Sequence, residues 1–369
     1  MACEVFEGMN TKRTFRLERK DLMDPLGRGA FGYVVRVFEE STNKEYAAKR
    51  MDLGKPSFPM EIYEYEKKNA LNIKAMADKI VGPKNLAIPI DECLNGKLYY
   101  LIYDFYHAKD LRQYMKTVEY IPEDEAWEII RQVYNGLFFI HKNLNLIHRD
   151  LKLDNIFLDT KTEKDNSPCR FKCYLGDFGL SKKAEEAETD CGTRETKAPE
   201  VSTGDYDTKA DLYSLGVIFY QMLFNTPPFR VFSTPTTEMV NGTYQIHKNN
   251  KVSDLAVAFI EACIQKDPKE RASGEELREF LQLDSLSMPF RIPPTLRTQF
   301  STKPQFTECS FIKGRKLFKQ GPLKLYKEHL EIIANKTFGY KEKCIQLDEA
   351  TCLSVIWDNK IKEDAWIDV

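Results

Sequence analysis

The stretch Ile147-His148-Arg149-Asp150-Leu151-Lys152-Leu153-Asp154-Asn155 decides the fold of this chain. It has the pattern H-R-D-L-x-x-x-N, which places an aspartate, a lysine and an asparagine close together. Two more short motifs follow further along the chain, Asp177-Phe178-Gly179 and Ala198-Pro199-Glu200. Each of these motifs alone could arise by chance, so the residues that precede them decide the interpretation.

Upstream lies the run Leu26-Gly27-Arg28-Gly29-Ala30-Phe31-Gly32-Tyr33-Val34, with the pattern G-x-G-x-x-G-x-V. Alone this pattern is weak, because an ordinary glycine-rich turn can have it and a dinucleotide-binding fold uses the same glycines. In that fold the run leads into a helix, whereas here the following β-branched and aromatic residues predict a strand. The run is therefore expected to join two antiparallel strands, where glycines let backbone N–H groups approach phosphate oxygens.

A lysine in the next strand-like run, Ala47-Ala48-Lys49, is expected to place an ammonium group in a cleft, where it needs an anionic partner. Five motifs in this order and at this spacing can hardly coincide by chance. On these residues the sequence resembles the eukaryotic protein kinase family, serine/threonine-specific branch, over about residues 20–283. The resemblance implies an α+β, bilobal kinase-like fold with a β-rich N-lobe and an α-helical C-lobe.

The resemblance also implies a phosphotransferase that uses ATP and Mg²⁺, a reaction in which the protein mainly neutralises charge and aligns a hydroxyl group. Asp150 would act as the catalytic base and Lys152 would neutralise the γ-phosphate. Lys49 would hold the α- and β-phosphates. Asn155 and Asp177 would bind Mg²⁺, an ion that prefers few protein carboxylates together with phosphate oxygens.

A carboxylate from a helix expected over residues 60–77 would orient Lys49. Glu66 is our choice, because its separation from Lys49 and the residues that follow it look like the family's helix; Glu64 is the alternative. Asn69 and Ala70 depart from the family, which has large apolar residues there. We expect this helix to be poorly anchored, so that activity would depend on a partner or on the C-terminal tail.

The resemblance places the nucleotide between residues of both lobes. The implied positions are Leu26, Gly27, Gly29, Gly32, Val34, Ala47, Lys49, Asp104, Tyr106, Asp110 and Phe157. Tyr103 would close the rear of the adenine pocket. For Val34, Ala47 and Phe157 plain core packing is the alternative, and both interpretations are compatible.

Through residues around Asp150, the resemblance also implies which hydroxyl groups the enzyme phosphorylates and how it is regulated. Lys152 and Thr193 are typical of enzymes that phosphorylate serine or threonine, and Asp110 with Asp154 would favour a basic residue upstream of the acceptor. Arg149 would pair with a phosphorylated residue in the activation segment 177–200, for which Thr189 is the best candidate. The acidic residues around Thr189 could instead supply the negative charge themselves, or form a merely solvated loop. An upstream kinase or a regulatory partner is thus expected.

Composition and charge exclude several other classes. Of the 369 residues 42% are hydrophobic and 30% are charged, which rules out wholesale disorder. Lys and Arg number 54 against 56 acids, so the net charge of -2 offers no overall basic field for nucleic acid. The nine cysteines include no C-x-x-C pair, which favours a reducing compartment. The first residues lack an apolar signal region, so we expect a cytoplasmic or nuclear protein.

Changes in texture divide the chain into an N-terminal extension (1–19), a kinase domain (20–283), a proline-containing linker (284–308) and a small β-rich appendage (309–369). Helical periodicity is expected from residue 122 onward and over 210–224, 253–265 and 274–281, the last with a capping box of Ser273 and Glu276. The appendage faintly resembles pleckstrin-homology-like or polo-box-like folds. Its basic cluster leaves a phosphoinositide contact, a nuclear signal or a solvated strand face open.

Two other functions are alternatives to a protein kinase. The first is a pseudokinase scaffold that recruits partners through the appendage. Intact Lys49, Asp150, Asn155 and Asp177 argue against it, because a scaffold has no physical need for all four. The second is a small-molecule phosphotransferase, which fits poorly with Glu200 and its expected partner Arg271.

Overall fold

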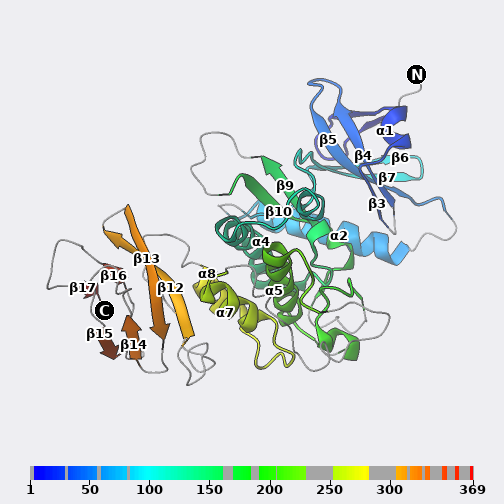
Figure 1. The fold of residues 1–369 in the computed structure, drawn as a ribbon. Helices are drawn as coiled ribbons and strands as arrows, with labels where there is room; N and C mark the ends of the chain where they lie inside the picture. The colour runs from blue at the N-terminus through cyan, green and yellow to red at the C-terminus, as the bar shows by residue number, and fades with distance from the viewer. Residues whose placement is uncertain are drawn as a thin grey trace. The chain divides into compact units, whose positions relative to one another are not determined.

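The computed structural model describes residues 4–29, 32–55, 60–80, 84–160, 169–183, 191–204, 206–229 and 252–281, and strands between 305 and 368. Figure 1 shows the helices and strands with their labels, and these residues divide into two compact units. The first comprises Met1–Glu119, Gln132–Thr193 and Gly204–Asp211, and the second Tyr120–Arg131, Arg194–Thr203 and Leu212–Val369. Thr189 and most of the predicted linker lie outside the described residues.

The first unit starts with a seven-stranded antiparallel sheet of order β1-β2-β4-β5-β7-β6, with β3 paired to β4. Its strands are β1 (Glu4–Glu7), β2 (Thr14–Leu17), β3 (Gly27–Gly29), β4 (Gly32–Glu39), β5 (Glu45–Asp52), β6 (Asp91–Asn95) and β7 (Leu98–Asp104). A bridge between Gly8 and Cys93 links the two ends of this order. The segment expected to be an N-terminal extension therefore contributes two strands to the sheet, followed by the short helix α1 (Arg19–Met23).

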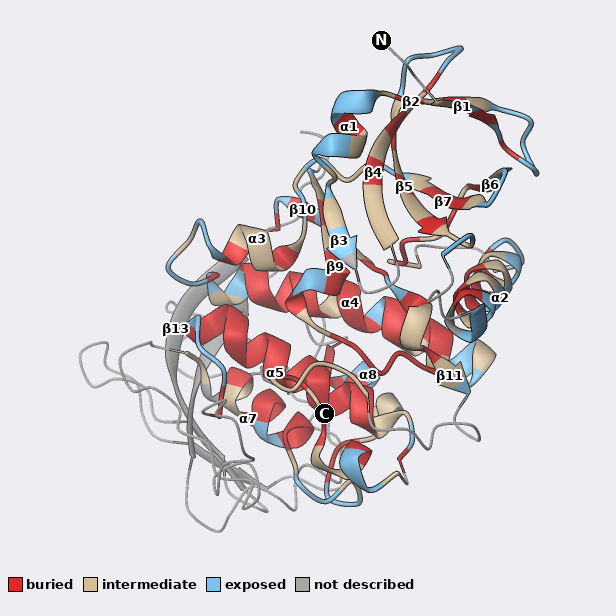
Figure 2. Ribbon diagram, turned by 90° about the vertical axis from the view of Figure 1, so that its right-hand side faces the viewer, coloured by how far each residue is buried: buried red, intermediate tan, exposed pale blue. Residues whose placement is uncertain are grey.

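Alternation along the strands gives the sheet two apolar faces. On one face Val35, Val37 and Ala48 pack with Phe6 and Phe15 of the β1–β2 hairpin. On the other face Met51, Tyr99 and Leu101 pack with Tyr63 and Ala70 of the helix α2 (Met60–Ala77). Figure 2 shows buried and half-buried positions along β4 and β5, and buried positions beside exposed ones on α2. Each face of one sheet is thus covered by a different part of the chain.

The predicted helices are confirmed, with small differences at their ends. Besides α2, they are α4 (Glu123–Leu144), α5 (Lys209–Phe224), α7 (Asp254–Cys263) and α8 (Gly274–Leu281); α3 (Leu111–Met115) is an additional short helix. The capping box is present, because Ser273 N–H donates to Glu276 Oε2 at 2.7 Å and Glu276 N–H donates to Ser273 Oγ at 3.3 Å. In the second unit the Trp127 ring packs on Phe219 and Phe259, with centroids 4.4 and 5.2 Å apart.

Short strand pairs in the first unit hold the two motif-bearing loops. β8 (Leu146–Ile147) pairs with β11 (Lys182–Lys183), and β9 (Ile156–Thr160) pairs with β10 (Phe171–Leu175). The segment His148–Asn155 runs from β8 to β9 and ends in a 3₁₀ turn over Leu153–Asn155. Asp177 starts a second 3₁₀ turn, Phe178–Leu180, between β10 and β11. The paired strands fix the ends of both loops.

The predicted β-rich appendage is confirmed at the level of backbone pairing. β12 (Gln305–Lys313), β13 (Lys316–Leu325), β14 (His329–Ile332) and β15 (Lys343–Gln346) form an antiparallel sheet, and β16 (Ser354–Ile356) pairs with β17 (Trp366–Asp368). β12 starts inside the segment expected to be linker, because Gln305 to Glu308 pair with Leu325 to Pro322. A strand-rich region followed by a helix-rich region confirms the expected α+β class. Among the described residues, no helix has the length and apolarity needed to cross a membrane.

Candidate active site

Lys49 joins two carboxylates that come from distant parts of the first unit. Its Nζ lies 2.5 Å from Glu66 Oε1 of α2 and 3.0 Å from Asp177 Oδ1. The side chains of Lys49 and Glu66 are only 17% and 4% exposed. Glu64, the alternative partner, is exposed to solvent. The structure therefore brings together Lys49, Glu66 and Asp177 as the sequence predicts.

The charges in this group stabilise one another. Burial alone would lower the pKa of Lys49, but the Asp177 and Glu66 carboxylates outweigh it and hold that pKa well above its ordinary value. Burial alone would raise the pKa of Asp177, but the Lys49 ammonium outweighs it and lowers the pKa. Burial raises the pKa of Glu66, against the opposing effect of Lys49. The lysine is thus protonated and the Asp177 carboxylate ionised, which suits it for binding a cation.

The Asp150 carboxylate is held by a cation and by a hydroxyl group. Lys152 Nζ lies 2.6 Å from Asp150 Oδ2, and Thr193 Oγ1 donates to Asp150 Oδ1 at 2.7 Å. Asn155 Nδ2 donates to the backbone oxygen of Asp150 at 2.8 Å. All four predicted residues therefore meet in one place, with the orientation of Asp150 set from two sides.

Asp211 anchors the loop that carries Asp150. Its carboxylate accepts the backbone N–H of His148 at 2.7 Å and that of Arg149 at 2.9 Å, and it lies 2.8 Å from His141 Nε2. Burial would raise the pKa of Asp211, but the hydrogen bond and charge of His141 outweigh it and lower the pKa. The His148 ring in turn contacts the backbone oxygen of Gly176 at 3.0 Å, a link between the two loops that the sequence analysis missed.

Two residues of the site have left-handed backbone conformations. Arg149 has φ of 72° and Asp177 has φ of 62°. Such conformations are unfavourable for residues other than glycine and persist only where the surroundings impose them. At Arg149 the Asp211 carboxylate contributes to that constraint, since its two oxygens accept the N–H groups of two successive peptides, those of His148 and Arg149.

The glycine-rich run forms the predicted antiparallel hairpin. Gly27 pairs with Val34, and Gly29 pairs with Gly32. A Cβ on Gly32 would lie 2.2 Å from the backbone oxygen of Arg50, whereas a Cβ on Gly27 would meet only Val34 at 3.9 Å. Gly32 is therefore required for the close approach of β4 to β5, independently of any ligand. Leu26, directly before β3, is 40% exposed.

Four of the other predicted nucleotide positions lie in two groups. Val34 lies opposite Lys49 in the β4–β5 register, and Ala47 lies opposite Tyr103 in the β5–β7 register. Because paired residues in antiparallel strands share a face, these residues lie on the same side of the sheet as Lys49. Phe157 pairs with Asp110 in an isolated bridge, so these two positions also lie together. Asp110 caps α3, since its Oδ1 accepts Gln113 N–H at 2.8 Å.

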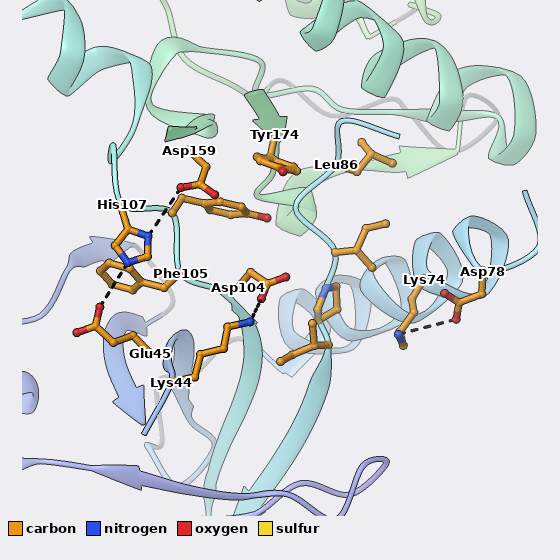
Figure 3. Close-up of a pocket in the computed structure, with 14 residues that line it drawn as sticks. Lys44, Glu45, Lys74, Asp78, Leu86, Asp104, Phe105, His107, Asp159 and Tyr174 are labelled. Atoms are coloured by element: carbon orange, nitrogen blue, oxygen red, sulfur yellow. Dashed lines mark hydrogen bonds and ion pairs between the residues drawn. The ribbon is translucent and has the colours of Figure 1, made fainter. Parts of the chain in front are cut away.

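Asp104 and Tyr106 lie at a cavity, and the Tyr106 ring also stacks on Phe157, another predicted nucleotide position, with centroids 5.7 Å apart. Both line a cavity of about 520 Å³ whose lining does not include Lys49, Asp150 or Asp177. Figure 3 shows Asp104 paired with Lys44, at 3.1 Å, and His107 between Glu45 and Asp159 at its rim. The Tyr106 ring stacks on Tyr174 with centroids 4.6 Å apart.

Two further pairings are expected from the sequence, one with a regulatory role and one with a structural role. The pairing of Arg149 with Thr189 stays a prediction, because Thr189 lies outside the described residues; Arg149 Nη1 donates to the backbone oxygen of Leu180 at 3.3 Å. The expected bridge of the second unit is present, since Arg271 Nη1 and Nη2 lie 2.5 and 3.1 Å from the two Glu200 oxygens. The Arg271 side chain is fully buried, which gives this bidentate pair a structural role.

The anchoring of α2 is where the sequence-based expectation was wrong. Asn69 is buried and its Nδ2 donates to the backbone oxygens of Phe178 at 3.1 Å and Ser181 at 2.7 Å. Lys67 Nζ lies 3.4 Å from Glu92 Oε2 of β6. The helix is therefore tied to its surroundings by polar links, where the family pattern had led us to expect apolar ones. The unusual Asn69 was visible in the sequence, but its partners were not.

Comparisons with known proteins agree with the geometry. Residues 21–282 match the family model described as the protein kinase domain, so the chain belongs to the protein kinase family. It is 30% identical over 261 residues to "Calcium-dependent protein kinase 4" of Plasmodium berghei (strain Anka), which covers 69% of this chain and 47% of that protein. It is 26% identical over 297 residues to "Phosphorylase b kinase gamma catalytic chain, liver/testis isoform" of Mus musculus, covering 76% of this chain and 70% of that one.

A third relative extends the match further along the chain. "Probable serine/threonine-protein kinase PLK" of Dictyostelium discoideum is 27% identical over 342 residues, 89% of this chain and 32% of that protein. Such a share of the chain is more than residues 1–282 contain, so this match includes part of the region beyond the kinase domain. The chain spans about half the length of the Plasmodium kinase.

Proposed function

We propose that this chain is an ATP- and Mg²⁺-dependent protein kinase that transfers the γ-phosphoryl group of ATP to serine or threonine hydroxyls of proteins. The observation that carries the proposal is the pair of groups around Asp150 and Asp177: one carboxylate held by Lys152 and Thr193, the other held with Glu66 by Lys49. Phosphoryl transfer needs charge neutralisation and an aligned hydroxyl, and these two groups offer both.

The residues present fit Mg²⁺ and a triphosphate. The ionised Asp177 carboxylate supplies oxygen ligands, and because Asn155 Nδ2 already donates to the Asp150 backbone, the Asn155 amide oxygen is the atom left for a metal. Bound there, Mg²⁺ would neutralise phosphate charge. Lys49 would hold the α- and β-phosphates, and the Gly27–Gly32 hairpin would offer backbone N–H groups.

In the proposed step the substrate hydroxyl oxygen forms a bond to the γ-phosphorus while the bond to the β–γ bridging oxygen breaks. ADP leaves with that electron pair, and the hydroxyl proton passes to the Asp150 carboxylate. Lys152, at 2.6 Å from Asp150, neutralises charge on the transferred group. Thr193 fixes the other carboxylate oxygen, so that the remaining lone pairs face the acceptor.

A basic residue upstream of the acceptor is proposed to contact Asp154, whose side chain is 48% exposed and lies 3.2 Å from Arg112. A substrate arginine would replace Arg112 in this exposed pair. Matched peptides with Arg or Ala at successive upstream positions test the preference, and equal rates for all of them would contradict it.

Phosphorylation of Thr189 by an upstream kinase is the proposed regulation, and unchanged activity in Thr189→Ala would contradict it.

Radiolabel transfer from ATP to a library of Ser/Thr peptides tests the central proposal. Wild type is compared with Asp150→Asn and Asp177→Asn, and with Asp24→Asn as an exposed control of the same chemical change. We expect transfer by wild type and the control, and a loss of about 10²-fold or more in the other two. Equal signal from all four proteins would contradict the catalytic assignment.

A further inference from the structure

Asn69 is a polar residue placed where α2 meets the Asp177 loop. It is 6% exposed, and both of its partners, the backbone oxygens of Phe178 and Ser181, can only accept hydrogen bonds. The amide nitrogen of Asn69 must therefore be the atom that faces them, and it uses both of its protons. One side chain thus spans the 3₁₀ turn that follows Asp177.

The position of Asn69 couples it to the charged group at Lys49. Asn69 follows Glu66 by three residues, so both side chains lie on the same face of α2. Their partners are also neighbours, since Glu66 meets Asp177 through Lys49 and Asn69 meets Phe178 directly. The fit is close, because a Cβ on Gly179 would lie 3.2 Å from Glu66 Oε2. Moving this turn away from α2 would separate Asp177 from Lys49.

A hydrogen-bonded link fixes the relative position of two segments more closely than an apolar contact does. Apolar side chains tolerate sliding by a fraction of an ångström, whereas donors and acceptors need defined distances and directions. Leaving buried carbonyl groups without their donor is costly, so the link favours one position of the turn strongly. Lys182, whose Nζ lies 5.1 Å from the Tyr65 ring centre, adds a second contact between α2 and the same segment.

We propose that Asn69 is a positioning residue whose two hydrogen bonds to Phe178 and Ser181 hold the turn after Asp177 against α2, so that Glu66 and Asp177 meet at Lys49. The proposal deepens the proposed function, since it names what keeps the site assembled. The helix would then need no partner to supply the missing apolar contact.

Hydrogen–deuterium exchange of the full chain tests the link without relying on catalysis. Asn69→Asp keeps the shape but removes both donors, and Asn72→Asp makes the same change at an exposed position of the same helix. We expect peptides covering residues 178–183 to exchange about tenfold faster in the Asn69 variant alone. Equal exchange in the two variants, or acceleration spread evenly over the chain, would overturn the proposal. Asn69→Leu with Asn72→Leu repeats the comparison without added charge, should Asn69→Asp fail to fold.

A double-mutant cycle tests whether Asn69 acts through Glu66. We expect Asn69→Asp to lower kcat/KM for ATP about tenfold in the wild-type background but less than about twofold in Glu66→Gln, because the pair it positions is already broken. Equal losses in both backgrounds would show a merely structural role. If wild type transfers no phosphate, the proposed function fails, and the exchange experiment still decides whether the link exists.

Discussion

The β1–β2 hairpin and the helix α2 cover opposite faces of one sheet and are attached in different ways. The hairpin inserts Phe6, Phe15 and Leu17 into an apolar cluster. Its polar contacts lie away from Lys49: Asp91 accepts the backbone N–H groups of Asn10 and Thr11 at 3.0 and 3.2 Å, and Tyr100 Oη donates to Glu4 Oε2 at 3.0 Å. The helix adds to its apolar contacts the links of Glu66, Lys67 and Asn69.

Because of this difference, one face contributes mainly to the stability of the fold and the other to the geometry of the candidate site. Apolar burial is non-directional and its worth scales with area, so the hairpin face contributes mainly to the free energy of unfolding. Ion pairs and hydrogen bonds depend on defined distances, so the α2 face determines where the charged groups of the candidate site lie. Variants on the two faces should therefore differ in kind, and four predictions test this, from the largest expected effect to the smallest.

Replacing Lys49 by Met should have the largest effect, on activity. The substitution removes the cation that joins Glu66 and Asp177, and we expect kcat/KM to fall by about 10²–10³-fold or more. Lys68→Met, at an exposed position of α2, is the control and should retain wild-type kinetics. Steady-state kinetics with a Ser/Thr peptide measure the activity of both variants. Comparable activity in the two would show that the α2 face of the sheet does not determine the geometry of the site.

Phe15→Ala should show the opposite pattern. This ring is fully buried in the hairpin cluster and packs edge-on against Tyr46 at 5.6 Å. We expect the free energy of unfolding to fall by about 3–4 kcal/mol because a cavity is left behind. The kcat of the protein that remains folded should stay within about threefold of wild type, since the change alters no distance at Lys49. Urea unfolding measures the loss of stability, and enzyme kinetics at urea concentrations below the unfolding transition measure kcat. A large loss of kcat would show that the two faces of the sheet do not act separately.

Asp91→Asn should cost less stability and remove a pH dependence. Burial alone would raise the pKa of Asp91, but the hydrogen bonds from Thr11 and Asn10 outweigh it and lower the pKa. A lowered carboxyl pKa stabilises the fold above the ordinary value of 3.8 and loses this contribution as the pH falls below it. We expect a loss of about 1–3 kcal/mol at neutral pH that shrinks below about pH 4, with Asp24→Asn as control. A difference that is independent of pH would contradict the role of the charge.

Lys67→Met should have the smallest effect. Its ammonium lies 3.4 Å from Glu92 and its side chain is 28% exposed, so solvent weakens the pair. We expect less than about 1 kcal/mol of lost stability, declining with added salt in wild type. Lys68→Met is again the control. A loss as large as that of Phe15→Ala would mean that α2 depends on this ion pair far more than its exposure indicates.

Local patterns predicted most of the elements. The helix over Met60–Ala77, the capping box of Ser273 and Glu276, and the glycine-rich hairpin all depend on neighbours a few residues apart, which a sequence displays directly. The two strands before residue 20 were missed because short segments of mixed polarity become strands only when an existing sheet offers them a partner. The start of β12 at Gln305 was missed for the same reason, since its partner is β13.

By itself the sequence determined most of the groups in the site: the order and spacing of five motifs selected Lys49, Asp150, Asn155 and Asp177, and left Glu66 preferred but Glu64 open. Only the tertiary structure decided how these groups are held. The preference for Glu66 over Glu64 depends on which helix face meets the sheet. The link from Asn69 to Phe178 and Ser181 joins residues more than a hundred positions apart. Such contacts follow from packing, because a hydrogen-bond partner is chosen by distance in space and leaves no periodic trace along the chain.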